Sequence, residues 1–161
     1  MELFETRLPL GEIGMRMGAA LVLGLLIGLE REWRQKAAGL RTNMLVCLGS
    51  CVFLILGLEI LQKTDEAAAQ IDPTRIIEGI IGGIGFLGAG SIIRSGGDVR
   101  GLTTGAAIWS SGAVGVSCGA GKFSIALLLT GGILFTLFIV GALEHKAEKV
   151  MGRRASEPDG D

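Results

Sequence analysis

The chain has 161 residues, of which 49% are hydrophobic and 19% are charged, and its mean hydropathy is +0.55. The charges fall in short clusters between long apolar blocks, as in chains that cross a bilayer, whereas a soluble core would alternate apolar and polar residues. The net charge is −1 and no basic stripe carries interleaved aromatic residues, so we expect no nucleic-acid partner.

The N-terminal sequence MELFETRLPLGE is acidic before its first apolar stretch, so we expect no cleaved signal peptide. The three cysteines, Cys47, Cys51 and Cys118, are odd in number and lie in apolar segments, which argues against a disulfide framework. The only histidine, His145, lies far from them, so we expect packing residues rather than a metal site, and no cofactor.

Five apolar segments approach the roughly 20 residues that a membrane-spanning helix needs, at residues 13–29, 42–61, 76–93, 102–120 and 123–143. The sequence therefore predicts an all-α, polytopic bundle of about five transmembrane helices. The fourth segment is rich in Gly, Ser, Thr and Ala, so it would be stable mainly when packed among other helices. Asp72 and Pro73 are predicted to begin the third helix, as N-cap and first-turn residue.

The Lys and Arg residues of the predicted loops are unevenly distributed. Ten fall on one side, in the first loop, the third loop and the C-terminal tail: Arg31, Arg34, Lys36, Arg41, Arg94, Arg100, Lys146, Lys149, Arg153 and Arg154. Four fall on the other: Arg7, Lys63, Arg75 and Lys122. This bias predicts that the N-terminus lies outside the membrane and the C-terminus lies in the cytoplasm. Residues 1–145 would form the transmembrane domain, and residues 146–161 a charged, disordered tail.

Three ionisable residues, Arg16, Glu59 and Glu78, lie within or near apolar segments, where charges are costly. At about 1.5 Å per residue, all three lie in the outer half of the membrane, about 21 to 27 Å from its cytoplasmic edge. Arg16 and Glu78 match best in depth and charge, so we expect them to pair. Two interpretations stay open: a structural ion pair that fixes helix register, or a polar site open to the periplasm.

Glycines recur four residues apart at several places, a spacing that lets membrane helices approach closely. The pairs are Gly14 and Gly18, Gly24 and Gly28, Gly79 and Gly83, Gly101 and Gly105, and Gly115 and Gly119. The third span is densest, so we expect helix packing, in a tight bundle, a homo-oligomer interface or both, at Gly79, Gly82, Gly83, Gly85, Gly88 and Gly90. Gly83, Gly85 and Gly88 match a dinucleotide-binding pattern, which needs a preceding strand and an exposed helix N-terminus. This match lies in the middle of a predicted span, so we reject that interpretation.

The first and third loops are predicted on the same side of the membrane, and both mix acids with bases. Topology alone needs only the bases. We therefore predict one connected cytoplasmic face with a partner or regulatory role, formed by Glu30, Arg31, Glu32, Arg41, Arg94, Asp98 and Arg100. The alternative is that these charges only hold the loops together.

Five sequence blocks carry a resemblance to a known family: GLERE at 28–32, KAAGLRT at 36–42, DPTRI at 72–76, GGIGFLGAG at 82–90 and VRGLTTGAAIW at 99–109. With this order and spacing, the chain resembles the MgtC/SapB family of bacterial inner-membrane proteins. The resemblance implies a polytopic protein with a cytoplasmic C-terminus. Some members add a small soluble α+β domain, and since this chain ends soon after its last predicted span, we expect the short form without it.

The resemblance also implies a role in adaptation to low magnesium, with virulence in some relatives through survival inside host cells. It implies, from the best-studied members of the family, action by binding other membrane proteins, including the ATP synthase, rather than by transport of magnesium. We therefore expect a non-enzymatic protein that works through protein contacts within the lipid bilayer. The alternative is an ion transporter or channel component. An enzyme is disfavoured because Ser110 and Ser111 have no histidine base within the spans.

Overall fold

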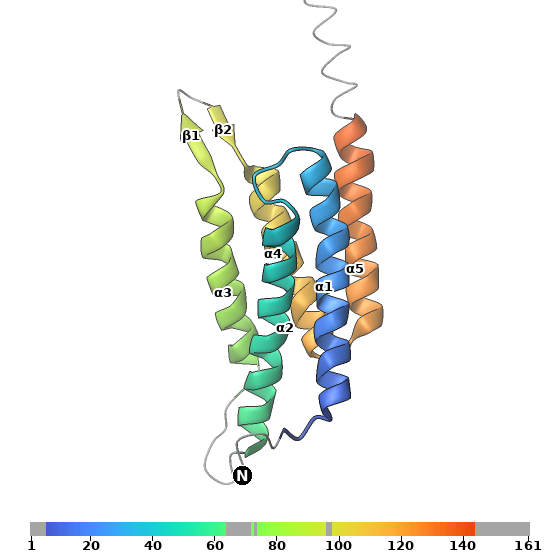
Figure 1. Cartoon of the computed structure of the whole chain (residues 1–161). Helices are drawn as coiled ribbons and strands as arrows, with labels where there is room; N and C mark the ends of the chain where they lie inside the picture. Colours follow the sequence, from blue (N-terminus) through green and yellow to red (C-terminus); the bar gives the residue numbers. More distant parts are fainter. Residues whose placement is uncertain (1–5, 64–71, 73, 96–97, 144–161) are drawn as a thin grey trace, which may run out of the picture.

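The computed structural model describes residues 6–63, 72, 74–95 and 98–143. In this part of the chain, five helices run in alternating directions: α1 (Leu10–Trp33), α2 (Leu40–Lys63), α3 (Thr74–Gly90), α4 (Leu102–Gly119) and α5 (Phe123–Phe135) (Figure 1). A short antiparallel hairpin of β1 (Ile93–Ser95) and β2 (Asp98–Arg100) joins α3 to α4. Helix α5 continues as a π-helical segment, η2 (Thr136–Val140). The predicted helical fold is confirmed, and the hairpin is an addition that the sequence had not indicated.

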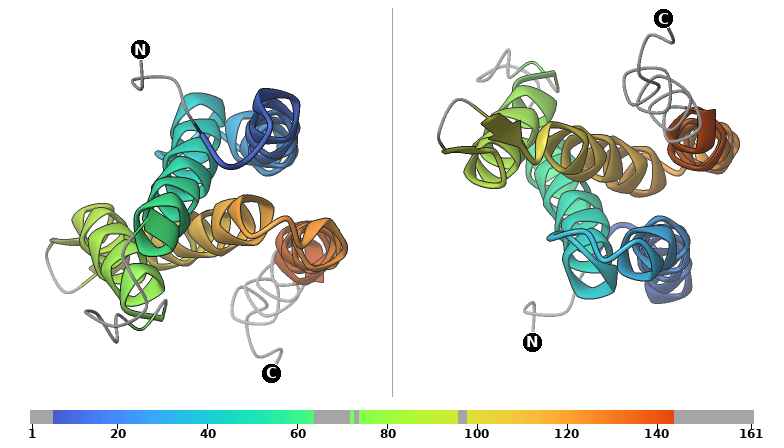
Figure 2. Two further views of the ribbon diagram at one scale, coloured as in Figure 1. Left: turned by 90° about the horizontal axis from the view of Figure 1, so that it is seen from below. Right: turned by 90° about the horizontal axis from the view of Figure 1, so that it is seen from above.

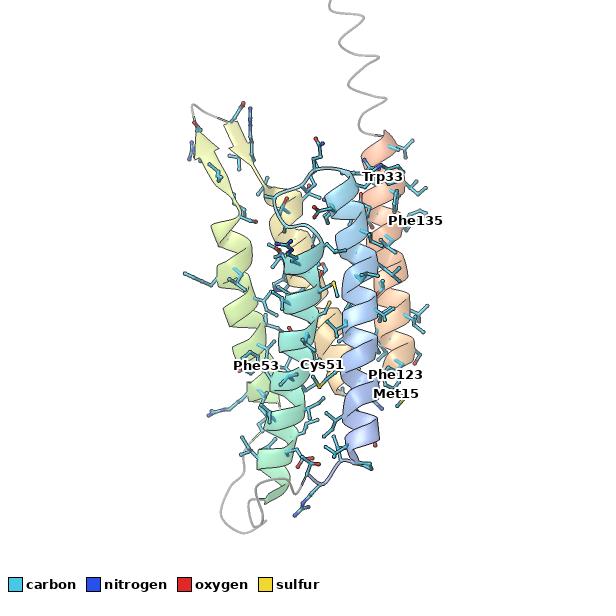
Figure 3. All side chains as sticks on the ribbon, viewed as in Figure 1. Met15, Trp33, Cys51, Phe53, Phe123 and Phe135 are labelled. Atoms are coloured by element: carbon cyan, nitrogen blue, oxygen red, sulfur yellow. The ribbon has the colours of Figure 1, made fainter. Side chains whose placement is uncertain are left out.

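Among the described residues, three helical segments are long and apolar enough to cross a membrane: Leu10–Trp33, Leu40–Leu61 and Phe123–Leu143. Helix α3 has only 17 residues, and α4 is diluted by glycine, serine and threonine. Large apolar side chains such as Trp33, Phe53 and Phe135 point outwards (Figure 3), and each is more than half exposed. Such a surface suits contact with lipid rather than water.

The packing order places α2 between α1 and α3, and α4 between α3 and α5 (Figure 2). The central core cluster lies among α1, α2, α4 and the last helix, and it includes the free, buried thiols of Cys47, Cys51 and Cys118. These cysteines are packing residues, as the sequence predicted. The predicted tail, residues 146–161, lies outside the described residues.

Close backbone packing explains the glycines near the end of α1 and those of α4, whereas a Cβ on Gly14 or Gly18, earlier in α1, would have no described atom within 4 Å. A Cβ added to Gly28 would lie 2.7 Å from Leu40 Cα, and one added to Gly24 would lie 2.9 Å from Asn43 O. On α4, a Cβ on Gly119 would lie 2.7 Å from Cys51 O. A larger residue at these positions would force the helices apart, so the sequence sets how closely α1 and α4 approach α2.

The predicted packing glycines of α3 behave differently. Of that set, only Gly88 meets another helix, because its Cβ would lie 3.1 Å from Gly105 O. A Cβ on any of the other five would have no described atom within 4 Å: Gly79, Gly82, Gly83, Gly85 and Gly90. Within the described part of this chain these five therefore leave open surface and do not pack against another helix. Packing at an interface with a second copy, the other form of the prediction, stays a prediction.

Both ends of α3 follow from local chemistry. Asp72 Oδ1 accepts a hydrogen bond from Thr74 N at 2.9 Å, which confirms the predicted N-cap and lowers the pKa of the Asp72 carboxyl; Pro73 lies outside the described residues. At the other end the helix stops at Gly90, short of the predicted residue 93. Gly101, at a φ of 90°, then turns the hairpin into α4 beside Ser91 O, where a Cβ would clash.

Candidate functional site at the α1–α2 turn

A buried ion cluster lies at the end of α1. Glu30 and Arg31 are each only 2% exposed, and Arg31 Nε lies 2.5 Å from Glu30 Oε2. Arg34 Nε lies 2.8 Å from Glu30 Oε1, an ion pair in which no N–H is well aligned with the oxygen. One carboxylate thus serves two guanidinium groups, and Arg31 Nη1 is buried without a hydrogen-bond partner among the described residues. The cluster carries net positive charge, with one donor still available.

Arg34 ties this cluster to the last helix. Its guanidinium lies 5.7 Å from the centroid of the Phe138 ring, and Nη2 donates to Phe138 O at 3.5 Å. Trp33 adds a tilted ring contact to Phe138 at 6.3 Å between centroids. Phe138 lies in η2, and π-helical turns interrupt the regular pairing of backbone carbonyls. The sequence prediction omitted Arg34 from the site, although its spacing of four residues from Glu30 was a signal for pairing.

The turn between α1 and α2 is itself tightly organised. Gln35 N donates to Glu32 O and Lys36 N donates to Arg31 O, both at 2.9 Å, so α1 ends in a Schellman motif with Gln35 at a φ of 53°. The exposed Glu32 side chain accepts from Leu40 N at 3.1 Å, where its charge favours the N-terminus of α2. Gly39 lies against the Glu32 carboxylate with no room for a Cβ. The motif residues of this turn therefore have defined structural roles.

A second polar group links α2 to α4 next to this turn. The fully buried Asn43 donates from Nδ2 to Ala38 O at 3.0 Å and to Gly39 O at 2.8 Å. Its Oδ1 accepts from Ser111 Oγ at 2.8 Å, and Cys47 Sγ lies 3.0 Å from Ser111 O. Sequence reasoning missed Asn43, although an amide inside an apolar span is a recognisable signal.

The predicted cytoplasmic face divides into two groups. Both lie at the same end of the bundle (Figure 1). Arg100 Nη2 lies 3.9 Å from Asp98 Oδ2 on the hairpin, with both side chains at least 80% exposed, while Arg41 and Arg94 are exposed and unpaired among the described residues. No ion pair or hydrogen bond between described residues joins the hairpin charges to the buried cluster. The face is thus one end of the molecule, but not one connected network.

The structure does not form the predicted pair of Arg16 and Glu78. Arg16 pairs instead with Glu12, one turn earlier, and its Nη1 donates to Gly119 O at 2.6 Å. Glu78 is exposed on α3, and α2 lies between α1 and α3 (Figure 2). A backbone carbonyl at the C-terminal end of α4 is therefore a partner of Arg16. Matching side chains by depth and charge could not reveal this partner, because it belongs to the backbone.

Glu59, the third intramembrane charge, binds the segment before α1. Its carboxylate accepts from Arg7 N at 3.1 Å and from Leu8 N at 3.0 Å, and the residue is only 9% exposed. Arg16 and Glu59 thus both serve contacts inside the chain. In the described part of the chain, no three His, Cys, Asp or Glu residues are grouped so as to hold a metal ion.

Comparison with known proteins identifies the family. The MgtC family model matches residues 17–146. The chain belongs to the MgtC family. It is 45% identical over 126 residues to Protein MgtC of Salmonella typhimurium strain LT2, which covers 78% of this chain and 51% of that protein. It is 40% identical over 151 residues to Protein MgtC of Brucella abortus strain 2308, covering 93% of this chain and 60% of that protein.

The chain therefore spans between half and three-fifths of the length of these MgtC relatives. No solved structure matches it. Family membership and the outward apolar helices together make this a membrane protein. The family's matched region, residues 17–146, contains the buried ion cluster, the Asn43–Ser111 contact, α3 and the hairpin.

Proposed function

We propose that this chain is a non-enzymatic protein of the bacterial inner membrane that acts through contacts with other membrane proteins in adaptation to low magnesium. The observation that carries the proposal is the outward face of α3, where Gly82 and Gly90 lie open beside the exposed Phe86. Open glycines let another transmembrane helix approach closely. The ATP synthase, implied by the family resemblance, is one partner to test by co-purification.

The proposal includes the crossing of the membrane by all five helices, with the α1–α2 turn and the hairpin in the cytoplasm. It is supported by the six bases Arg31, Arg34, Lys36, Arg41, Arg94 and Arg100 at that end, against Arg7, Lys63, Arg75 and Lys122 at the other. Alkaline phosphatase fused after residue 150 should be inactive, whereas a fusion after residue 66 should be active. An active fusion after residue 150 would overturn the orientation.

The functional role of the hairpin can be separated from a structural one. Asp98 and Arg100 are so exposed that their mutual contact contributes little to stability. We expect Asp98→Asn with Arg100→Gln to abolish rescue of a low-magnesium growth defect while membrane protein levels stay normal. Quantitative blotting beside the growth assay measures both, with Lys122→Gln at the opposite end as control. Full rescue by the double variant would argue against a partner-binding hairpin.

The alternative is an ion transporter or channel component. It is favoured by the buried Arg31 guanidinium with an unpaired Nη1 and by the Asn43–Ser111 contact inside the bundle. It is disfavoured because Arg16 and Glu59 are engaged within the chain. Proteoliposomes loaded with a magnesium or pH indicator distinguish the two functions: flux above that of empty liposomes, lost in Asn43→Leu, would support transport.

A further inference from the structure

An apolar groove of about 620 Å³ runs between α2 and α3. This volume is within the range of ligand-binding pockets, roughly 300–1,000 Å³. Glycines on both walls account for its width, because a Cβ on Gly49, Gly79 or Gly83 would have no described atom within 4 Å. Its lining includes Leu45, Gly49 and Phe53 of α2 and Gly79, Gly83 and Leu87 of α3.

The groove is almost free of polar groups. Its one hydroxyl, on Ser50, donates to Val46 O at 2.7 Å within α2, so it needs no hydrogen-bond acceptor from a bound molecule. A molecule bound along these walls must therefore present hydrocarbon, since an unmet polar group there would cost free energy.

The two ends of the groove differ in width. At one end Ile76 packs against Gly57, where a Cβ would lie 2.6 Å from Ile76 Cδ1, so α2 and α3 touch. Towards the other end the two helices separate (Figure 1). A transmembrane helix about 10 Å across needs a slot of even width. A flexible hydrocarbon chain can instead occupy a groove that narrows until its two walls meet.

The wide end lies next to positive charge. Arg41 is one turn before Leu45 on α2, and Arg94 follows the end of α3 in β1. Both side chains are exposed, and neither forms an ion pair or hydrogen bond with another described residue. Asp98, the nearby acid of the hairpin, pairs with Arg100. Unpaired guanidinium groups present donors in the geometry that suits phosphate.

We propose that the groove holds one acyl chain of an anionic phospholipid, with the lipid phosphate bound by Arg41 and Arg94. The tail enters the narrowing apolar groove and the headgroup stays at the wide, basic end. Basic pockets between helices recognise anionic headgroups in this way. This site adjoins the face of α3 offered to partner proteins, but neither Gly82 nor Phe86 lines it. Lipid binding does not depend on which way the chain inserts.

The test uses the full chain purified in detergent, titrated with phosphatidylglycerol or phosphatidylcholine and read by native mass spectrometry as bound lipid per chain. We expect at least a tenfold preference for phosphatidylglycerol. Gly83→Leu fills the groove where space exists, so it should lower phosphatidylglycerol binding at least tenfold. Gly82→Leu is the matched control, because its Cβ is equally unobstructed but Gly82 does not line the groove.

The headgroup contact has its own variants. Arg41→Gln with Arg94→Gln should abolish the preference between the two lipids, whereas Arg75→Gln, at the opposite end of α3, should keep it. Should Gly83→Leu fail to fold by circular dichroism and gel filtration, Gly49→Leu fills the same groove from α2.

Three results overturn the proposal: equal binding of both lipids by the unaltered chain, equal losses in Gly83→Leu and Gly82→Leu, or a dimer that Gly83→Leu dissociates. The last would assign the groove to a second copy of the chain. A low-magnesium growth defect confined to Gly82→Leu would support the proposed partner contact without bearing on the lipid site, so the two ideas fail separately.

Discussion

Helices α4 and α3 are both rich in glycine, but their glycines meet different surroundings. On α4, Gly115 and Gly119 face the α2 backbone with no room for a methyl group. On α3, Gly79, Gly82 and Gly83 face open space. The same glycine spacing therefore has two different effects. Where another helix of the chain lies alongside, it allows close packing within the bundle. Where no described helix lies alongside, it leaves a surface open to another molecule.

The charges follow the same division. Glu30 and Arg31, at the end of α1, are buried against each other, whereas Asp98 and Arg100, in the hairpin after α3, are at least 80% exposed. The compact part of the molecule, α1, α2 and α4, therefore depends on its polar contacts. The α3 arm, meaning α3 with its hairpin, should depend much less on its own.

The largest expected effect comes from Glu30→Ala, which leaves Arg31 buried without its counter-charge. Removing one partner of a buried ion pair costs about 3–5 kcal/mol. We expect a loss of that size in the free energy of unfolding, measured by denaturant titration in mixed micelles. Asp98→Ala is the control and should change stability by less than about 1 kcal/mol. Equal effects of the two substitutions would show that the buried and the exposed ion pairs contribute equally to stability.

Gly115→Ala should destabilise by about 1–3 kcal/mol, because the added methyl group would overlap Cys47 O on α2. Gly82→Ala places the same methyl group in open space, and since alanine favours helix over glycine it should be neutral or slightly stabilising. Unfolding curves of both variants, collected in the same micelles, measure the difference. A destabilised Gly82→Ala would show that Gly82 packs closely against another part of the molecule.

Ser111→Ala tests the polar contact between α2 and α4. It leaves Asn43 Oδ1 buried without its donor, which costs about 1–3 kcal/mol. The neighbouring Ser110 makes no hydrogen bond through its side chain with another described residue, so Ser110→Ala should leave the melting temperature nearly unchanged. Equal melting temperatures for the two variants would mean that the buried amide finds another donor.

The smallest effect concerns Gln35, which holds a φ of 53° at the end of α1. A left-handed conformation costs a residue with a side chain about 1–2 kcal/mol, and glycine avoids that cost. Part of the gain is lost because glycine has more conformational entropy in the unfolded state. Gln35→Gly should therefore stabilise the compact part by about 0.5 kcal/mol, seen as a small rise in melting temperature. Gln35→Ala keeps the strain and should show no rise.

Sequence patterns predicted the helices well because apolar length and capping are local properties: Asp72 caps α3, and α5 begins at Phe123 as expected. They could not predict which glycines face a helix, since that depends on the packing order of α2, α3 and α4. The Arg16 partner was missed for a related reason. Its acceptor is Gly119 O, and a backbone carbonyl has no signature in the sequence.

The candidate site was predicted in part. Glu30, Arg31 and Glu32 lie at the α1–α2 turn as one structural unit, but Arg41 and Arg94 stand apart from it. Side-chain type and order suggested a single charged face. Burial divided it, because only the charges that α1 and α2 enclose need partners, while those of the hairpin are solvated.

Segment η2 has a consequence for how the chain tolerates a change in its length. In an α-helix, removing one residue turns everything beyond it by about 100°, so a deletion within α2 would swing Asn43 or Glu59 away from their partners. A π-helical turn already holds one residue more than an α-helical turn. We therefore expect a chain lacking Ile139 to close that turn into regular α-helix, with Arg34 still facing Phe138. Among the described helices, the last is thus the one in which we expect the loss of a single codon to be best tolerated.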